Sequence, residues 1–360
     1  MKAVVLVGGE GTRLRPLTYT TPKQLLPVAE VPMVERVLAA LERHGVDEVV
    51  LSLGYRPDAF LEAYPSGMAG GVHLDYAVEP EPLDTAGAIR FAAEHAGISE
   101  TFVVVNGDVL TDLDVSGLVA FHRERCAQAT ISLVAVDDPS RFGVVPTEED
   151  GRVVQFVEKP PRGQAPSNCI NAGTYVLEPE VVRRIPRGRR VSVERETFPA
   201  LATDGKLYAL RSDRYWLDTG TPEAYLQANA DAVMGRRGTP PAPGAQLVAE
   251  GVWAMPDATI DGEVRAASLV GHGASLEHGS FVCGSVIGAG ARVAASARVE
   301  GSVVLPGATI GPGATVRSSI IGHAAVVGRD CNVDSVTIVG DRAIVPDGAD
   351  FVGGRVASDC

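Results

Sequence analysis

The chain has 360 residues, of which 45% are hydrophobic, and its formal net charge at pH 7 is −13. This length exceeds what one hydrophobic core usually supports, so we expect two domains. The acidic balance argues against nucleic-acid binding, which needs a basic face to neutralise phosphates. A small phosphorylated ligand would therefore need a local basic site within an acidic protein.

The chain shows no signal for export or membrane insertion. Its first apolar run, residues 3–7, is too short for a signal-peptide core, and no later run approaches the roughly 18 apolar residues of a membrane span. The five cysteines form no C-x-x-C pair and no metal-like spacing. These cysteines are Cys126, Cys169, Cys283, Cys331 and Cys360. We expect a cytoplasmic protein without a disulfide framework or a zinc site.

Up to about residue 230, short apolar runs alternate with helical patterns. Expected strands cover residues 3–7, 48–53 and 102–105, and expected helices cover residues 33–44, 86–95 and 222–234. This alternation predicts an α/β fold, a Rossmann-like and mostly parallel sheet with helices on its faces. In such sheets ligands bind beyond the carboxyl ends of the strands.

The periodicity changes after residues 235–244, a stretch rich in Gly, Pro and Arg that suits a linker. Aliphatic residues then recur about every six positions, with small residues and glycines between them, in triplets that start 17 residues apart. They are Val270, Leu276, Val282, Ile287, Val293, Val299, Val304, Ile310, Val316, Ile321, Val327 and Val333. This hexapeptide pattern predicts a left-handed parallel β-helix.

These two patterns divide the chain into a catalytic domain at residues 1–234, the linker, and a β-helix domain at residues 245–360. A β-helix has open ends and flat faces, which often serve in oligomer contacts. We therefore expect a homo-oligomer of undetermined size.

A glycine-containing loop follows the first expected strand. Residues 8–18 read GGEGTRLRPLT and residues 22–27 read PKQLLP. Backbone N–H groups of such a loop can surround phosphate, and cations in it can neutralise a leaving pyrophosphate, so Arg13 and Lys23 are candidate catalytic cations. The alternative is an ordinary glycine turn with two surface bases. The loop lacks both G-x-G-x-x-G and G-K-[ST], which excludes the dinucleotide and P-loop motifs.

Two isolated aspartates stand where strands end. Asp108 follows an apolar strand in the sequence Asn-Gly-Asp, with Asp112 and Asp114 close behind, and Asp218 lies in the sequence Trp-Leu-Asp-Thr-Gly. Magnesium prefers one or two protein carboxylates together with phosphate oxygens. A lone Asp near a turn is more often a cap. The presence of both aspartates with the glycine loop favours a Mg²⁺ site.

Together these motifs resemble the sugar-1-phosphate nucleotidyltransferases over nearly the whole chain. The resemblance also rests on the runs Glu-Lys-Pro at 158–160 and Asn-Ala-Gly at 171–173 and on the hexapeptide tail. Within that family, residues 192–201, 206–209 and 219–226 are most similar to the mannose-1-phosphate guanylyltransferases. The resemblance implies transfer of a nucleotidyl group from GTP, or another nucleoside triphosphate, to mannose 1-phosphate.

The resemblance also implies a role for each matching residue. Nucleotide binding is implied for Leu6, Gly8, Gly9, Gly11, Thr12, Arg13, Glu79, Asp84 and Thr85. Sugar-phosphate binding is implied for Gly143, Glu158, Lys159 and Asn171. Catalysis is implied for Arg13, Lys23, Asp108 and Asp218, of which the two aspartates hold Mg²⁺. The alternative for Glu158 and Lys159 is an exposed ion pair without a binding role.

Two positions bear on the choice of base. Relatives that use pyrimidine nucleotides typically carry an amide where this chain has Glu79. An ionised Glu79 only accepts hydrogen bonds, which suits the adjacent N1–H and N2–H donors of guanine, whereas the alternative is a solvated surface glutamate. The family's usual P-L-G-T-A-G reads P-L-D-T-A-G here, so Asp84 occupies a position where glycine permits a positive φ.

Three alternatives remain open at this stage. One is a glucose-1-phosphate thymidylyltransferase, and another is a non-catalytic regulatory subunit that binds a nucleotide sugar. The third is a bifunctional enzyme whose β-helix also transfers an acyl group, with His272, His278 or His323 as base. The sequence leaves the sugar, the strictness of base choice and any feedback regulation open.

Overall fold

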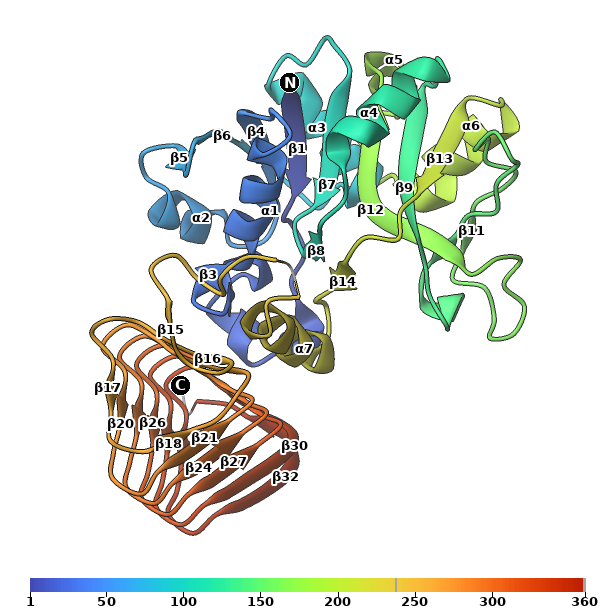
Figure 1. Cartoon of the computed structure of the whole chain (residues 1–360). Coiled ribbons are helices and arrows are strands. Elements are labelled where there is room, and N and C mark those ends of the chain that lie inside the picture. Colours follow the sequence, from blue (N-terminus) through green and yellow to red (C-terminus); the bar gives the residue numbers. More distant parts are fainter. Residues whose placement is uncertain (237, 359–360) are drawn as a thin grey trace. The chain divides into compact units, whose positions relative to one another are not determined.

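The computed structural model describes residues 1–236 and 238–358 (Figure 1). Arg237, Asp359 and Cys360 lie outside the described residues, so the expectation for Cys360 is not examined by the structure. The chain forms two compact units, Met1–Gly9 with Val34–Trp216 and Glu10–Met33 with Leu217–Cys360. Residues 10–33 therefore group with the C-terminal repeats, although they follow the first strand in sequence. The expected linker at residues 235–244 stays a prediction.

The first unit is built on a mixed sheet. Its main path runs β11 (Val157–Glu158), β10 (Gly143–Val144), β12 (Cys169–Leu177), β7 (Phe102–Asn106), β1 (Lys2–Leu6), β4 (Glu48–Leu53), β6 (Val72–Val78) and β5 (Met68–Ala69). Strands β9 (Ala129–Ala135) and β13 (Leu207–Arg211) branch from β12. The centre, β7-β1-β4-β6, is parallel as predicted, whereas β12 pairs antiparallel with β7, β9 and β10. The Rossmann-like α/β fold is confirmed.

Helices cover this sheet. They are α1 (Met33–Glu42), α2 (Pro57–Ala63), α3 (Asp84–His95), α4 (Val115–Glu124), α5 (Pro179–Arg184) and α6 (Phe198–Thr203), preceded by a π-helical turn at Val193–Thr197. Helix α3 packs on β1, β4 and β6 and buries Ala86, Ile89 and Ala93, the spacing of one helical face. Asp114 caps α4 by accepting a hydrogen bond from the Gly117 N–H at 2.9 Å. Among the helices described, none has the length and apolarity that crossing a bilayer requires.

The second unit contains short 3₁₀ turns, a hairpin, one helix and the repeats. Residues 10–33 form turns at Thr12–Leu14, Leu17–Tyr19 and Lys23–Leu25 and the hairpin β2 (Pro27–Val28) and β3 (Val31–Pro32). Helix α7 spans Pro222–Val233, capped by the Thr221 hydroxyl. Strand β15 (Gln246–Ala249) pairs antiparallel with β16 (Val252–Ala254), and parallel coils follow.

The coils stack into two parallel sheets that are visible in Figure 1. In spatial order, one sheet runs from β16 through β19 (Ser268–Val270), β22 (Val286–Ile287), β25 (Val303–Val304), β28 (Ile320–Ile321), β30 (Asn332–Val339), β27 (Thr315–Arg317), β24 (Arg298–Glu300) and β21 (Phe281–Cys283) to β18 (Glu263–Val264), with β32 (Asp350–Val356) paired to β30. The other contains β17 (Thr259–Ile260), β20 (Ser275–Leu276), β23 (Arg292–Val293), β26 (Thr309–Ile310), β29 (Val326–Val327) and β31 (Ile344–Val345). The predicted β-helix is confirmed.

All twelve aliphatic residues of the predicted repeat are buried in one core. That core continues past Val333 through Val339 and Val345, which sequence periodicity missed. The reason is a slip of one residue inside β30. Thr315 pairs with Asn332, 17 residues on, but Ile320 pairs with Ile338, 18 residues on, and Ser335 and Val336 both take positive φ.

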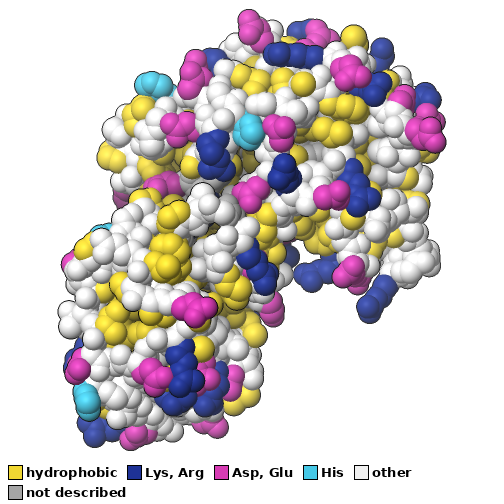
Figure 2. Space-filling model, viewed as in Figure 1, with side chains coloured by type: hydrophobic (Ala, Val, Ile, Leu, Met, Phe, Trp, Pro, Cys, Tyr) yellow, Lys and Arg dark blue, Asp and Glu magenta, His cyan; other side chains and the backbone are white. Residues whose placement is uncertain are grey.

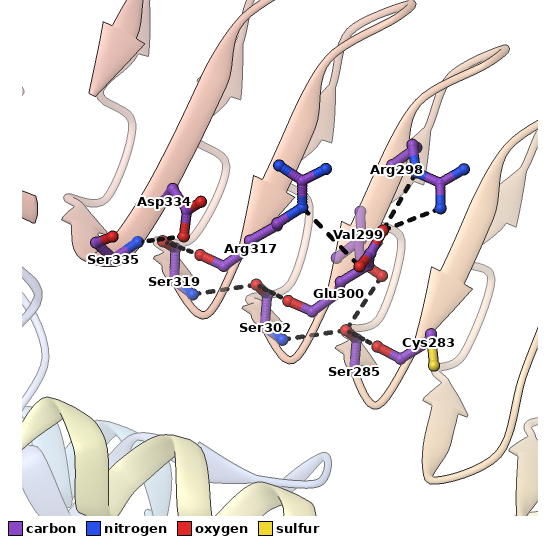
Figure 3. A network of polar contacts seen from close by, with 10 residues as sticks. All are labelled: Cys283, Ser285, Arg298, Val299, Glu300, Ser302, Arg317, Ser319, Asp334 and Ser335. Atoms are coloured by element: carbon purple, nitrogen blue, oxygen red, sulfur yellow. Dashed lines mark hydrogen bonds and ion pairs between the residues drawn. The ribbon is translucent and has the colours of Figure 1, made fainter. Parts of the chain in front are cut away.

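A column of serines stabilises one corner of the coils (Figure 3). The N–H groups of Ser285, Ser302 and Ser319 each donate to the hydroxyl of the serine 17 residues earlier, at 3.3, 3.1 and 3.1 Å. The hydroxyls of Ser285, Ser302 and Ser319 each donate to the carbonyl two residues earlier. These serines are buried, so the ladder satisfies polar groups that water cannot reach.

Surface charge is mixed on the face drawn in Figure 2. Lys and Arg side chains are interspersed there with Asp and Glu side chains. Ion pairs on the coils include Arg298 with Glu300 at 3.0 Å and Arg265 with Glu263 at 2.7 Å. The net charge of −13 is therefore not gathered into one acidic region on that face.

The coil corners require residues in the left-handed backbone region. One corner column, Gly273, Gly290, Gly307, Ala324 and Arg342, has φ between 52° and 72° throughout. A Cβ on Gly290 would meet no atom within 4 Å, whereas a Cβ on Gly288 would lie 2.8 Å from the Pro306 nitrogen. The two neighbouring glycines therefore serve different purposes, backbone conformation at 290 and close packing at 288.

Urea unfolding of two alanine variants separates these purposes. We expect Gly290→Ala to lower the free energy of unfolding by about 1 kcal/mol, the cost of placing a Cβ in the left-handed region. Gly288→Ala should lower it by about 3 kcal/mol or more, because its Cβ would overlap backbone that cannot rotate away. Equal losses in the two variants would contradict this assignment.

Candidate active site

The candidate nucleotide residues of the first unit gather at the carboxyl ends of its parallel strands. Leu6, the last residue of β1, is in register with Asn106, the last residue of β7. Gly8 follows β1, and a Cβ there would lie 3.2 Å from the Gly54 nitrogen after β4 and 3.6 Å from the Glu79 carboxylate after β6. Three adjacent strand ends thus bring Gly8, Gly54 and Glu79 together, where open α/β sheets bind ligands.

The Asn-Gly-Asp motif lies beside the Asn-Ala-Gly motif. Gly107 donates its N–H to the Leu6 carbonyl at 2.9 Å, and a Cβ there would lie 2.6 Å from Val7. Gly173 has φ +78°, and a Cβ on it would lie 2.8 Å from the Asn106 side chain. Because both glycines permit close approach, Asp108 leaves the end of β7 next to the Asn171–Gly173 segment of β12.

Glu79 is half-buried and hydrogen-bonded. Its Oε1 accepts from the Ser52 hydroxyl at 3.1 Å and its Oε2 from the Leu83 N–H at 3.0 Å. Burial raises the pKa of Glu79, while these two hydrogen bonds act in the opposite direction. The alternative of a solvated surface glutamate is wrong. Each carboxylate oxygen has a second lone pair, so the group can still accept from a ligand.

Asp84 takes the conformation that glycine favours. Its φ is +62°, and its own carboxylate accepts the Thr85 N–H at 2.8 Å. The Thr85 hydroxyl accepts from the Val193 N–H and donates to Glu194 Oε2, both at 2.8 Å. Asp84 is exposed and tolerates the left-handed region, so the start of α3 keeps its turn without glycine.

Three of the four predicted sugar-phosphate residues lie on paired or adjacent strands. Gly143 of β10 is in register with Glu158 of β11, and a Cβ on Gly143 would lie 3.1 Å from Glu158 Oε2. Asn171 lies on β12, which also pairs with β10. The Lys159 ammonium is 2.9 Å from Glu158, and its side chain is 59% exposed against 18% for Glu158. The ion pair therefore exists, but only the lysine end faces solvent widely.

The buried Tyr175 contacts Asn171, one of the predicted sugar-phosphate residues. Its hydroxyl accepts from the Asn171 side-chain amide at 2.9 Å, and the tyrosine is fully buried. Burial raises the pKa of Tyr175, and the negative charges of Glu194, Glu158 and Asp108 act in the same direction. The hydroxyl therefore stays protonated and fixes the Asn171 amide.

The second unit carries the two candidate cations. Gly11 has φ +60°, and its carbonyl accepts a hydrogen bond from the Thr18 hydroxyl at 2.9 Å. A Cβ on Gly11 would lie 3.2 Å from Lys23 Cβ. Lys23 is 6% exposed, whereas Thr12 and Arg13 are exposed. The loop is thus folded on itself, with the stem of Lys23 packed beneath the glycine turn.

Arg13 and Asp218 meet at Gly220, within the same unit. A Cβ on Gly220 would lie 2.3 Å from Arg13 Nη2 and 2.8 Å from Asp218 Oδ1. The Asp218 carboxylate accepts the Gly220 N–H at 2.8 Å. The Trp-Leu-Asp-Thr-Gly motif, at β14 (Trp216–Asp218) and the turn after it, therefore presents its carboxylate beside the Arg13 guanidinium, and glycine leaves the room.

The available donors suit magnesium rather than zinc. Within residues 1–236 and 238–358, no three His, Cys, Asp or Glu side chains cluster as a preformed metal site. Asp108 and Asp218 offer hard carboxylate oxygens, and magnesium takes few protein ligands when phosphate oxygens complete its shell. Each aspartate is thus a ligand of the type that magnesium prefers.

Sequence reasoning missed several residues of this region. Ser52 is a buried polar residue inside the apolar strand β4, which was a signal that it bonds to something specific. Glu194 and Tyr175 had no such signal, because their roles depend on how the turn at Val193–Thr197 and β12 pack. Trp216 donates its indole N–H to the Ala172 carbonyl at 2.9 Å and contacts Phe142 edge-on.

Comparison with known proteins agrees with this geometry. Residues 2–234 match the family model described as nucleotidyl transferase, and residues 264–357 match that described as GMPPB C-terminal domain. A mannose-1-phosphate guanylyltransferase of Mycobacterium tuberculosis is 44% identical over 293 residues, which are 79% of each chain. The catalytic subunit beta of that enzyme in Dictyostelium discoideum is 40% identical over 230 residues, 63% of each chain.

A solved structure shares the fold of part of the chain. HddC from Yersinia pseudotuberculosis, crystallised with GMP-PN, superposes with a TM-score of 0.54 at 31% identity, covering 63% of this chain and 97% of that chain. The family model covers more than half of the residues, with the glycine loop, Asp108 and Asp218 inside it. The chain belongs to the nucleotidyl transferase family.

Proposed function

We propose that this protein transfers a guanylyl group from GTP to mannose 1-phosphate, forming GDP-mannose and releasing pyrophosphate. The observation that carries the proposal is the likeness to a curated mannose-1-phosphate guanylyltransferase over 79% of the chain. The strand-end position of Glu79, with lone pairs available to a ligand, supports guanine as the base. The expected homo-oligomer and the cytoplasmic setting stay predictions.

The proposed reaction is an in-line attack by a sugar-phosphate oxygen on the α-phosphorus. Positioning and charge neutralisation supply most of the acceleration in such transfers. Arg13 neutralises the β- and γ-phosphates, and Lys23, whose stem is buried, places its ammonium near the reacting phosphates. Gly143, Glu158, Lys159 and Asn171 hold the sugar phosphate, with Glu158 accepting from sugar hydroxyls.

Magnesium, when bound, would neutralise charge on the triphosphate. Asp108 and Asp218 are the residues proposed to hold it. Asp218 accepts the Gly220 N–H, which fixes the orientation of its carboxylate. The turn after β14 thus prepares one ligand before the nucleotide binds.

Pyrophosphate release by the purified protein with magnesium tests the proposal. GTP, dTTP, UTP, ATP and CTP are each combined with mannose 1-phosphate and glucose 1-phosphate. A clear preference for GTP with mannose 1-phosphate is expected. A preference for dTTP with glucose 1-phosphate would instead identify a thymidylyltransferase, and no release in any combination would favour the regulatory subunit.

The same preparation decides the acyl-transfer alternative. His272 and His323 each lie beside an aspartate on a coil corner, at 3.0 Å from Asp257 and 3.2 Å from Asp341, and the His278 side chain is 91% exposed. The His272 and His278 side chains are exposed, whereas His323 contacts Asp341, whose side chain is 8% exposed. We expect no consumption of acetyl-coenzyme A.

Glu79→Gln should weaken discrimination for guanine. The amide can still accept the Leu83 N–H but directs an NH₂ donor toward donors of guanine, so we expect kcat/KM for GTP to fall about tenfold or more relative to dTTP. Burial raises the pKa of Glu79, so its carboxylate is lost as pH falls sooner than for an ordinary glutamate. KM for GTP in the wild type should therefore rise as pH falls, and the variant should lack this rise. An unchanged GTP to dTTP ratio would contradict the role of Glu79.

Gly220→Ala should reduce turnover without unfolding the protein. Its Cβ would displace the Arg13 guanidinium, the mobile end of a long side chain, and would press on the Asp218 carboxylate. We expect kcat to fall about 100-fold, the order of magnitude lost with one charge-stabilising group, with Tm nearly unchanged. Wild-type kcat in this variant would remove the Arg13 and Asp218 pair from the mechanism.

A further inference from the structure

The loop that carries the candidate cations is attached to the β-helix at several points. We call residues 10–33 the N-terminal loop; it belongs to the same compact unit as the coils. Helix α7 holds its hairpin, since the Tyr225 hydroxyl donates to the Pro27 carbonyl and the Asn229 side chain accepts the Ala29 N–H at 2.8 Å. The coils contact the loop at two further points, the hairpin residue Glu30 and, through the coil residue Asp341, the loop residue Thr20.

Glu30 attaches the hairpin tip to the β-helix. Ala29 and Glu30 both have positive φ, 46° and 71°, at a two-residue turn where Asn and Gly are usual, so the turn needs external support. The Glu30 carboxylate accepts the Ala289 N–H at 3.0 Å. A Cβ on Gly271 would lie 2.5 Å from Glu30 Oε2, so that glycine makes room for the carboxylate.

Asp341 attaches the middle of the loop to a later coil at the same corner of the β-helix. Its Oδ2 accepts from the Thr20 hydroxyl, and the Thr21 hydroxyl lies 3.5 Å away. Its Oδ1 accepts the His323 N–H at 2.8 Å. The Asp341 side chain is 8% exposed, and although burial acts to raise its pKa, hydrogen bonds from His323 and Thr20 lower it. Asp341 is thus a buried carboxylate with one oxygen for the coil and one for the loop.

Two further contacts join the last coils to the loop segment that carries Arg13. Gly340 permits Pro16 to approach, since a Cβ on it would lie 2.9 Å from Pro16 Cγ. The Arg355 guanidinium of β32 is 3.5 Å from the Arg13 carbonyl. The last coils therefore contact the loop at Arg13, Pro16 and Thr20.

Asp347 shows what an aspartate at a coil corner does without the loop. Its Oδ1 accepts the Arg329 N–H at 2.8 Å, 18 residues earlier, as Asp341 accepts that of His323, also 18 residues earlier. No hydrogen bond in the part of the chain that the structure describes joins Asp347 to residues 10–33. A coil corner therefore needs only the hydrogen bond that Oδ1 accepts, and the contact of Asp341 Oδ2 with Thr20 is an additional one.

We propose that Asp341 is a positioning residue for nucleotidyl transfer, which holds the N-terminal loop through Thr20 in the conformation that presents Arg13 and Lys23 to the triphosphate. The β-helix is on this view part of the nucleotide-binding machinery as well as a scaffold. The inference rests on the proposed function for its reaction but predicts GTP binding independently of turnover. Asp341 itself touches no substrate.

Steady-state kinetics and calorimetric GTP binding, on the full chain with magnesium, test this role. Asp341→Ala and Asp347→Ala each remove the acceptor of one backbone N–H, so both should lower Tm, and Asp341→Ala should lower it more because it also removes the contacts of a buried carboxylate with Thr20 and the His323 ring. Only Asp341→Ala should reduce kcat/KM for GTP and weaken GTP binding, by about tenfold, as expected for loss of a hydrogen bond to a charged group. KM for mannose 1-phosphate should stay within about twofold, because its proposed residues lie on the other unit.

Substitutions at Thr20, which is exposed, test the contact from the other side. Thr20→Val, which has the same shape but no hydroxyl, should reproduce the kinetic loss with Tm unchanged, and Thr20→Ser should retain wild-type kinetics. The double variant Asp341→Ala with Thr20→Val should lose little more kcat/KM for GTP than Asp341→Ala alone. The reason is that both substitutions remove the same hydrogen bond, that between Thr20 and Asp341.

The outcomes separate the two proposals. An active wild type whose kinetics and GTP binding survive Asp341→Ala and Thr20→Val overturns the positioning role and leaves the proposed function standing. Equal losses in Asp341→Ala and Asp347→Ala also overturn it, since the effect would be a general loosening of the coils. If the wild type releases no pyrophosphate, the proposed function fails, and the GTP affinities of the same variants still decide the positioning role.

Discussion

Hydrogen bonding to carboxylates at one corner of the β-helix determines where the N-terminal loop lies. That loop follows β1, and besides hydrogen bonds within itself it makes polar contacts with α7 and the coils, through Asn229, Glu30 and Asp341. The loop also buries apolar side chains of its own, among them Leu14, Leu17, Leu26 and Val28, and the carboxylates add fixed polar contacts to that packing. Asp341 is an acceptor on the coils for the loop, and Glu30 is an acceptor on the loop for the coils. These two hydrogen bonds give the loop the rigidity that phosphate binding requires.

The coils can hold a loop in this way because their own geometry is tightly constrained. Positive φ at every corner, the serine column and the stacked aliphatic core leave each coil one arrangement. Along that one corner, the coils that carry His323 and Asp341 therefore keep their spacing to the coils that carry Gly271 and Ala289. A β-helix of this kind is a rigid support over several coils.

Much of the fold followed from the sequence because period and residue type agreed. The twelve aliphatic residues, the parallel strands and α7 were all predictable from spacing alone. The continuation past Val333 was not, because one added residue at Ser335–Val336 changes the period from 17 to 18. Local periodicity cannot indicate a change of register whose only sign is backbone conformation.

The candidate site was predictable to a smaller extent. The placement of Gly8 and Asp108 followed from the rule that strand ends carry ligands, Glu79 was named only through the family resemblance, and the tolerance of Asp84 for a left-handed backbone followed from residue chemistry. The hydrogen bonds of Ser52 and Tyr175, and the attachment of Thr20 to a residue 321 positions later, depend on tertiary packing that no spacing encodes. For the same reason, motif position suggested that residues 10–33 belong with the parallel sheet.

Native-state hydrogen exchange of the intact protein at increasing urea tests most directly whether the N-terminal loop is held by the β-helix. Amides of residues 10–33 should lose protection together with those of the last coils, because they open as one cooperative unit. Loss of protection together with β1 and β7, while the coils stay protected, would contradict the account.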